Sequence, residues 1–204
     1  MAQAIPTPRD LRVLMRQVRR RQRTLVVGID GRGGSGKSTL SHALERADRE
    51  VTVVEFDDFY RPSSERNARA AEGDTEIGGN FDWRRLRDQV LVPLSQDEVA
   101  NYQRYDWVRD ELADWHVVPV GGIALIEGNY STRQELLGFY DFTIWIEAPH
   151  EVRLQRGLLR GGQDTRDRWL TEWMPEEDRY IEAEDPAKRV DLVLDGSGSE
   201  TRPT

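Results

Sequence analysis

Cysteine is absent from the 204 residues, so the chain can form no disulfide and carries neither a thiol nucleophile nor a thiolate metal site. Long hydrophobic runs are absent as well, because segments such as 25–27 and 123–126 are far shorter than the roughly 18 residues of a membrane-spanning helix. The first eight residues lack the basic and then apolar pattern of a secretory signal. Together these absences predict a cytoplasmic protein without a membrane segment.

Lysine is almost absent too, since only Lys37 and Lys188 are lysines among the 29 Lys and Arg residues. Biased codon use explains a general excess of arginine, so the two retained lysines draw attention to their positions. The formal net charge of −8 argues against a general nucleic-acid partner. Seven arginines do gather in 9–23, where the apolar residues have helical spacing. We interpret them as the solvated face of an amphipathic helix, with an RNA-binding arm as the alternative.

Apolar segments typical of buried strands alternate along the chain with amphipathic segments typical of helices. The alternation predicts a parallel sheet covered on both faces, which is a three-layer α/β/α fold, with five strands and one domain spanning residues 1–204. We expect a loop or mobile insertion over 62–80, a solvated acidic helix face over 172–185 and a frayed tail over 197–204, and we find no clean period over 97–115. The expected strands are 24–30, 51–56, 123–127, 142–147 and 190–194, and the expected helices include 37–48, 83–94 and 149–160.

Residues 31–38, GRGGSGKS, fill the phosphate-binding P-loop pattern G-x-x-x-x-G-K-[ST] without deviation. A predicted strand precedes the pattern and a predicted helix follows it. In that context glycines let backbone N–H groups converge on a phosphate, and the helix N-terminus favours its charge. The lysine can reach the β and γ phosphates, and the serine hydroxyl can bind Mg²⁺. We therefore predict ATP and Mg²⁺ as cofactors, with Gly31, Gly33, Gly34, Ser35, Gly36, Lys37, Ser38 and Thr39 at the nucleotide.

A P-loop alone fits motors, GTPases and kinases. The chain is too short for most motors, and Lys188 does not stand in the N/T-K-x-D motif of a GTPase. Asp57 and Asp58 directly follow a predicted strand, whose end should face the ligand crevice. A kinase needs such a carboxylate to accept the proton of the attacking hydroxyl, although a solvated turn or a helix cap is the alternative. Successive side chains point to opposite sides, so only one carboxylate can face the acceptor.

Several motifs in order resemble the uridine–cytidine kinase family, within the phosphoribulokinase and uridine kinase group. The resemblance covers about residues 25–196. It rests on the P-loop, Asp57-Asp58-Phe59-Tyr60, Asn80-Phe81-Asp82, Tyr105-Asp106-Trp107, Ile126-Glu127-Gly128 and the arginine-rich stretch 153–168. It implies that Asp57 is the catalytic base and a partner of Mg²⁺, bound directly or through another ligand, and that Glu127 acts on the same metal through water. From the P-loop chemistry above, we expect Ser38 to bind this metal and Lys37 to be catalytic.

The resemblance also implies how the phosphates and the acceptor are held. Converging guanidinium groups would stabilise the charge of the transferring phosphoryl group. Asp82 would hold ribose hydroxyls and Tyr105 would line the nucleoside pocket, formed by an insertion near 58–118. Arg156 and Arg160, which we expect to be catalytic, would lie on a helix, and Arg166 and Arg168 on a lid near 161–169, where they would bind the nucleotide.

Two positions depart from the family pattern. The family reads the pyrimidine with a histidine five residues after its motif tyrosine, where this chain has Asp110, and it has Arg-Asp where this chain has Arg160-Gly161. An ionised carboxylate accepts hydrogen bonds but donates none, so Asp110 would favour the amino group of cytosine over uracil if it faces the pocket. The alternative is that Asp110 points to solvent. Trp107 could stack on a planar substrate, with local packing as the alternative.

These observations predict an ATP-dependent kinase that phosphorylates a hydroxyl group of a small molecule, with uridine or cytidine as the first candidates. One alternative is a P-loop kinase for a non-nucleoside hydroxyl compound. Another is a nucleotide-binding regulatory protein without turnover, against which the retained Ser38, Asp57 and Glu127 argue. We expect a small-molecule partner, no nucleic acid and no membrane, and the sequence leaves a homo-oligomer open.

Overall fold

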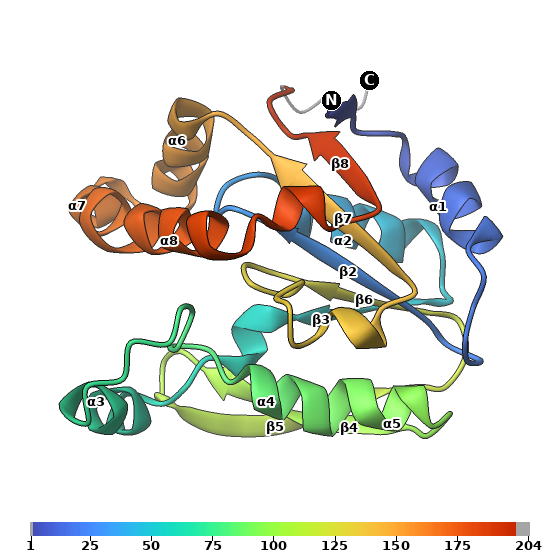
Figure 1. The fold of residues 1–204 in the computed structure, drawn as a ribbon, viewed down its shortest axis with the longest axis horizontal. Coiled ribbons are helices and arrows are strands. Elements are labelled where there is room, and N and C mark those ends of the chain that lie inside the picture. Colours follow the sequence, from blue (N-terminus) through green and yellow to red (C-terminus); the bar gives the residue numbers. More distant parts are fainter. Residues whose placement is uncertain (1, 199–204) are drawn as a thin grey trace.

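The computed structural model describes residues 2–198, so Met1 and most of the predicted tail, residues 199–204, lie outside the described residues. Within the described part of the chain the main sheet has six parallel strands in the order β1-β8-β7-β2-β6-β3 (Figure 1). The prediction of five strands was wrong by one. The additional strand, β1 (Gln3–Ala4), pairs with β8 (Leu192–Asp195) and is too short to show any period in the sequence.

The central strand, β2 (Leu25–Gly31), brings the predicted P-loop to the carboxyl end of the sheet. Its neighbours are β6 (Ile123–Glu127) and β7 (Phe142–Glu147), and β3 (Val51–Glu55) pairs with β6 at the edge. Because all these strands are parallel, their following loops meet at one end of the sheet. This end is where the predicted catalytic residues converge.

Alternate residues of β2 supply the two halves of the core. Leu25, Val27 and Ile29 face helices α1 (Pro8–Gln17) and α2 (Lys37–Ala47). Val26 belongs to the cluster on the opposite face, with side chains of α4 (Trp83–Leu86), α5 (Val92–Ser95) and α8 (Met174–Glu184). Burying one such aliphatic side chain contributes about 1.5–3 kcal/mol, so burial on both faces stabilises the predicted three-layer arrangement.

The segment between β3 and β6 forms an insertion beside the sheet (Figure 1). One expectation for it was wrong, and one segment without a clean period has regular structure. The predicted loop over 62–80 contains helix α3 (Ser63–Ala71), and the segment 97–115 forms most of an antiparallel hairpin, β4 (Ala100–Asp106) and β5 (Glu111–Val118). An irregularity in the pairing between Gln103 and Tyr105 interrupts the alternation that would have revealed the hairpin. A 3₁₀ turn η1 (Phe56–Phe59) and a π-helical turn η2 (Arg87–Leu91) complete the insertion.

The C-terminal part packs a helical arm against the P-loop. Gly157 lies against Trp169, and a Cβ atom there would come within 2.3 Å of the indole ring, so only glycine allows this approach. The predicted lid near 161–169 falls on short turns of this arm. No helix among the described residues is long and apolar enough to cross a membrane. The helices and turns of the C-terminal part are α6 (His150–Gly161), η4 (Gln163–Thr165), α7 (Arg166–Arg168), η5 (Trp169–Trp173), α8 and η6 (Pro186–Lys188). A separate turn, η3 (Leu137–Phe139), lies between β6 and β7.

Candidate active site

A cavity of about 2220 Å³ opens at the carboxyl end of the sheet. Its wall includes P-loop residues from Gly33 to Thr39, Asp57, Glu127 and Trp107, so it joins the predicted phosphate and acceptor regions. Sites for single small ligands are usually about 300–1000 Å³. The cavity therefore has room for a nucleotide and a second small molecule together.

The P-loop has the geometry that its glycines predict. Gly34 and Gly36 have φ angles of 76° and 108°, in the left-handed region, and α2 begins directly afterwards at Lys37. The Lys37 ammonium donates to the carbonyl oxygens of Gly31 at 2.8 Å and Arg32 at 3.1 Å. These contacts hold the lysine over the loop, which presents a helix N-terminus and a fixed positive charge to an anion.

The predicted metal ligands Ser38, Asp57 and Glu127 all line the cavity. Glu127 is only 4% exposed, and its Oε2 atom is buried without a hydrogen-bond partner. Burial raises the pKa of Glu127 to about 7; the Lys37 charge opposes the rise and the Asp57 charge adds to it. Two carboxylates and a hydroxyl form an all-oxygen donor set, which fits Mg²⁺.

Asp57 and Asp58 have different environments, although both lie in the 3₁₀ turn η1 and not at the end of a strand, where the predicted alternation would apply. Asp57 lines the cavity. The protein around its carboxyl group excludes water and so raises the pKa of Asp57, while the charges of Lys37 and Arg160 oppose the rise. Asp58 is buried and accepts hydrogen bonds from Tyr102 Oη at 3.0 Å and Arg104 Nε at 2.8 Å. Of the two carboxylates, only Asp57 lines the cavity, so its role toward an acceptor stays a prediction, and Asp58 binds the hairpin to η1.

The predicted phosphate-binding arginines divide into two groups. Arg156, Arg160 and Arg168 line the cavity, whereas Arg166 is exposed and is not part of its wall. The Arg156 guanidinium donates to the carbonyl oxygens of Gly34 at 3.2 Å and Gly196 at 2.8 Å, so it braces the P-loop. Arg168 pairs with Glu172 and stacks on Trp173 at the rim. Arg160 is the guanidinium whose charge acts directly on Asp57.

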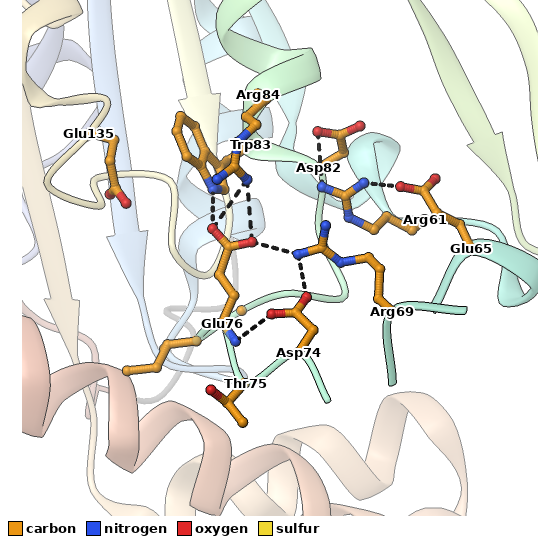
Figure 2. Close-up of polar contacts among 12 residues, drawn as sticks. Arg61, Glu65, Arg69, Asp74, Thr75, Glu76, Asp82, Trp83, Arg84 and Glu135 are labelled. Atoms are coloured by element: carbon orange, nitrogen blue, oxygen red, sulfur yellow. Dashed lines mark hydrogen bonds and ion pairs between the residues drawn. The ribbon is translucent and has the colours of Figure 1, made fainter. Parts of the chain in front are cut away.

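Asp82 lies in a dense network of ion pairs. Its Oδ1 atom accepts from the Arg85 N–H at 3.0 Å, which caps α4, and lies 3.1 Å from Arg61 Nη2. Figure 2 shows this pair beside a second group in which Glu76 binds the Trp83 indole at 2.8 Å and Arg69 at 2.8 Å. Asp82 is absent from the residues of the large cavity wall, so its ribose contact stays a prediction.

Tyr105 and Asp110 bind each other rather than lining the cavity. Asp110 accepts from Tyr105 Oη at 2.5 Å, from the Ser63 N–H at 2.9 Å and from the Ser63 hydroxyl, and the Ser63 and Tyr105 bonds lower its pKa to about 2. The carboxylate thereby joins the hairpin turn to α3. Trp107 does reach the cavity and stacks on Tyr60 with 4.5 Å between ring centroids. The predicted substrate contacts of Tyr105, Trp107 and Asp110 stay predictions.

Two polar residues of the site were not predicted from the sequence. Glu177 is 4% exposed, so the expectation of a wholly solvated acidic face over 172–185 was wrong. Spacing could have indicated this, because Glu177 lies three residues from the buried Met174 and three from the buried Tyr180, on one helix face. Asn129 lies just beyond the carboxyl end of β6 and accepts from Lys37 Nζ at 2.7 Å. Its position after a parallel strand was the available signal.

Comparison with known proteins assigns the family. A profile of the Phosphoribulokinase / Uridine kinase family matches residues 26–183. The chain belongs to this family. It is 29% identical to a uridine kinase of Deinococcus deserti over 155 residues, which are 73% of this chain and 72% of that protein.

Two solved structures with provisional names are also similar to this chain. One, named as a uridine kinase of Bacillus stearothermophilus, has a TM-score of 0.69 and 26% identity, over 93% of this chain and 97% of the other. Another, named as a fructose transport system kinase of Silicibacter, has a TM-score of 0.72 and 23% identity, over 94% and 99%, and is a likeness of fold alone. The predicted family, P-loop kinase fold and phosphotransferase activity are thus confirmed.

Proposed function

We propose that this phosphotransferase moves the γ-phosphoryl group of ATP, with Mg²⁺, to a hydroxyl group of a nucleoside. The observation that carries the proposal is the single cavity whose wall contains the P-loop, Asp57, Glu127 and the stacked pair Tyr60 and Trp107. A donor and an acceptor bound there would lie side by side in one cavity. Such positioning supplies much of the catalysis in phosphoryl transfer.

Asp57 is the proposed base. It takes the proton of the acceptor hydroxyl as the oxygen attacks the γ-phosphorus and the bond to the β-phosphate oxygen breaks. The Lys37 and Arg160 charges, which act on Asp57 in the structure, then lie beside the charge of the transferring group. Bound Mg²⁺ would supply charge neutralisation on the phosphate oxygens, and Ser38, Asp57 and Glu127 are the residues that would hold it.

Aromatic side chains support a planar acceptor. Tyr60, Phe81, Trp107 and Tyr130 all contribute to the cavity wall. Phe81 packs edge-on against Tyr60 with centroids 5.1 Å apart, and Trp107 is 58% exposed, so it can cover an incoming ring. Aromatic surfaces of this kind bind planar rings by stacking. A nucleoside base is the class of acceptor that uses such a wall best.

A non-nucleoside acceptor is the second candidate, and one feature favours it. The side chains expected to read a nucleoside are engaged with protein partners: Asp110 with Ser63 and Tyr105, and Asp82 with Arg61. A site that discriminates strongly against analogues needs polar groups directed at the substrate. Without them, a small hydroxyl compound other than a nucleoside would bind comparably.

An acceptor panel separates these candidates. ADP release from MgATP is measured with uridine, cytidine, adenosine, guanosine, hexoses and small hydroxy acids, each beside a mixture without acceptor and each with Asp57→Asn as the matched control. We expect release that depends on a pyrimidine nucleoside and disappears in Asp57→Asn. Release with only a non-nucleoside would favour the second candidate. Release that is equal in every mixture, with or without acceptor, would contradict both and indicate a nucleotide-binding protein without an acceptor.

A further inference from the structure

Glu177 connects helix α8 to the P-loop. Its Oε1 atom accepts from the Gly33 N–H at 2.7 Å and from Asn129 Nδ2 at 2.7 Å, and its Oε2 atom accepts from Arg153 Nη1 at 3.0 Å. The approach is close, since a Cβ atom on Gly33 would lie 2.7 Å from Oε1. Arg153 is 1% exposed, so the carboxylate and the guanidinium form a buried pair. A buried carboxylate that serves three donors fixes all three groups in place.

Asn129 transmits this constraint to the P-loop lysine. Its Oδ1 atom accepts from Lys37 Nζ at 2.7 Å, while its Nδ2 atom donates to Glu177. An ammonium only donates and a carboxylate only accepts, so the amide has one workable orientation between them. The three donors of Lys37 are then matched by three acceptors, two carbonyls of the loop and the amide of Asn129. Among the described residues, Asn129 is the one acceptor for Lys37 that lies outside the P-loop.

A second carboxylate braces the same elements from behind. Asp30 is fully buried and accepts from the backbone N–H groups of Gly31, Tyr130 and Thr132 at 2.7, 3.1 and 3.0 Å. It also accepts from Tyr180 Oη at 2.9 Å, which belongs to α8. The loop that carries Asn129 and the helix that carries Glu177 are therefore fixed to β2 independently of Glu177. Loss of the Glu177 side chain should leave this frame standing.

We propose that Glu177 is a positioning residue of the kinase, which acts through Asn129 to hold the Lys37 ammonium above the P-loop. The inference rests on the proposed nucleotide site, because Lys37 would then be placed for the β and γ phosphates. Glu177 touches no reacting atom in this scheme. From its place on α8, Glu177 fixes the position of the Lys37 ammonium. The helical arm thereby becomes part of the proposed phosphate site.

The two lysines of the chain allow a direct test. Protein labelled with ¹⁵N at lysine Nζ gives signals only from Lys37 and Lys188, and Lys188 is an internal control because its side chain is 82% exposed and pairs with Asp185. In Glu177→Ala we expect exchange of the Lys37 ammonium protons with water to accelerate by about tenfold or more, the scale of one lost charge-assisted hydrogen bond. Lys188 should not change. Glu182→Ala, which removes an exposed carboxylate of the same helix, should change neither signal.

Two further variants keep the test decisive. Glu177→Ala strands the buried Arg153, so Arg153→Met/Glu177→Ala removes that charge and should show the same Lys37 change, while Arg153→Met alone should not. Asn129→Ala alone should accelerate exchange of the Lys37 ammonium protons, and adding Glu177→Ala to it should cause no further acceleration.

Unchanged Lys37 exchange in a folded protein lacking Glu177, or in Asn129→Ala, would overturn the proposal, as would additive effects of the two substitutions. All signals are recorded without nucleotide or acceptor. If no acceptor in the panel is phosphorylated, the exchange measurement still tests the role of Glu177. Failure of the proposed function and failure of this inference are therefore distinguishable.

Discussion

The two sides of the cavity that we propose for the phosphates and for the acceptor are built differently. On the proposed phosphate side, the cavity wall contains the contiguous loop residues 33–39 and Glu127, and the Lys37 ammonium is held by Gly31, Arg32 and Asn129. On the proposed acceptor side, two predicted polar residues bind other protein groups and do not line the cavity. Asp58 binds Arg104, and Asp110 binds Ser63.

The difference teaches where each kind of chemistry is encoded. A P-loop needs only local backbone conformation and a following helix, so eight residues specify it. The acceptor wall needs pairs of residues from α3, η1 and the hairpin that are far apart in the sequence, such as Asp58 and Arg104. The same motif residues can therefore either bind a substrate or hold the insertion together.

The largest effect should come from breaking the phosphate side at its charge. Lys37→Ala should lower turnover by about 1000-fold or more, because the removed ammonium stabilises phosphoryl charge at the transition state. Lys188→Ala, the matched control on the surface, should keep wild-type turnover. Acceptor-dependent ADP release checks both variants, with circular dichroism to verify the fold. Near-normal turnover in folded Lys37→Ala would contradict the proposal that the P-loop side of the cavity takes part in the reaction.

Substitutions of the adjacent residues Asp57 and Asp58 test which carboxylate serves catalysis and which holds the insertion together. Asp57→Asn should lower kcat by at least about 100-fold, the scale of a lost general base. Asp58→Asn should keep most activity but lose about 1–3 kcal/mol of unfolding free energy, because Tyr102 and Arg104 lose a charged partner. Steady-state kinetics and urea unfolding of both variants provide the measurement. Equal losses of kcat, or the reverse order, would show that the two residues have been assigned to the wrong sides.

A substitution of Glu127 tests whether this residue helps to hold Mg²⁺. Glu127→Gln keeps the shape of the side chain but replaces an ionisable carboxylate with a neutral amide, a weaker ligand for a hard cation. We expect the Mg²⁺ concentration for half-maximal turnover to rise by about tenfold or more, within the range seen when groups at metal sites are removed. A Mg²⁺ titration at saturating ATP measures it. An unchanged requirement would mean that the metal is held without Glu127.

The smallest effect should come from the acceptor side. Asp110 has a positive φ of 56°, which asparagine tolerates, so Asp110→Asn removes the charge without straining the turn. We expect a higher KM for the acceptor, by about threefold, the scale of one weakened hydrogen bond, and an unchanged KM for ATP. The pKa of Asp110 is about 2 when folded, below its ordinary 3.8. Its stabilising effect is therefore complete above pH 3.8 and is lost as pH falls toward 2.

Thermal melting between pH 7 and pH 3 checks the sign of that effect. The Tm of Asp110→Asn should lie below that of the wild type at neutral pH, and the gap should narrow in acid. Asp110→His provides a second reading. If Asp110 serves the hairpin, the ratio of cytidine to uridine use should stay the same. If it reads the base, the ratio should move toward uridine.

Much of the central sheet could be predicted from sequence, because its buried strands are short segments rich in apolar, mostly β-branched residues. The predicted ranges 123–127 and 142–147 agree with β6 and β7 at both ends. The P-loop residues were predicted for the same local reason. Helix α3 was missed although Ser63–Ala71 is rich in residues with high helix propensity, because the polar, glycine-containing context of 62–80 indicated a loop.

What could not be predicted depends on contacts between distant residues. The sequence shows Asp110 at a substrate-reading position but contains no signal that Ser63 occupies its carboxylate. Glu177 stands in a strongly acidic run, and its burial follows from Arg153 on α6 and Gly33 of the P-loop. In both cases the chemistry of a residue is set by a partner that only the fold supplies.

The central claim, that one cavity carries phosphoryl transfer from ATP to a small hydroxyl compound, is tested most directly by ³¹P NMR. MgATP is mixed with the pooled acceptor panel and with either the wild type or Asp57→Asn. We predict that with the wild type the γ-phosphate signal declines while ADP and a phosphomonoester signal grow in equal amounts, and that Asp57→Asn leaves ATP intact. Growth of inorganic phosphate in place of a phosphomonoester, or no change with the wild type, would contradict it.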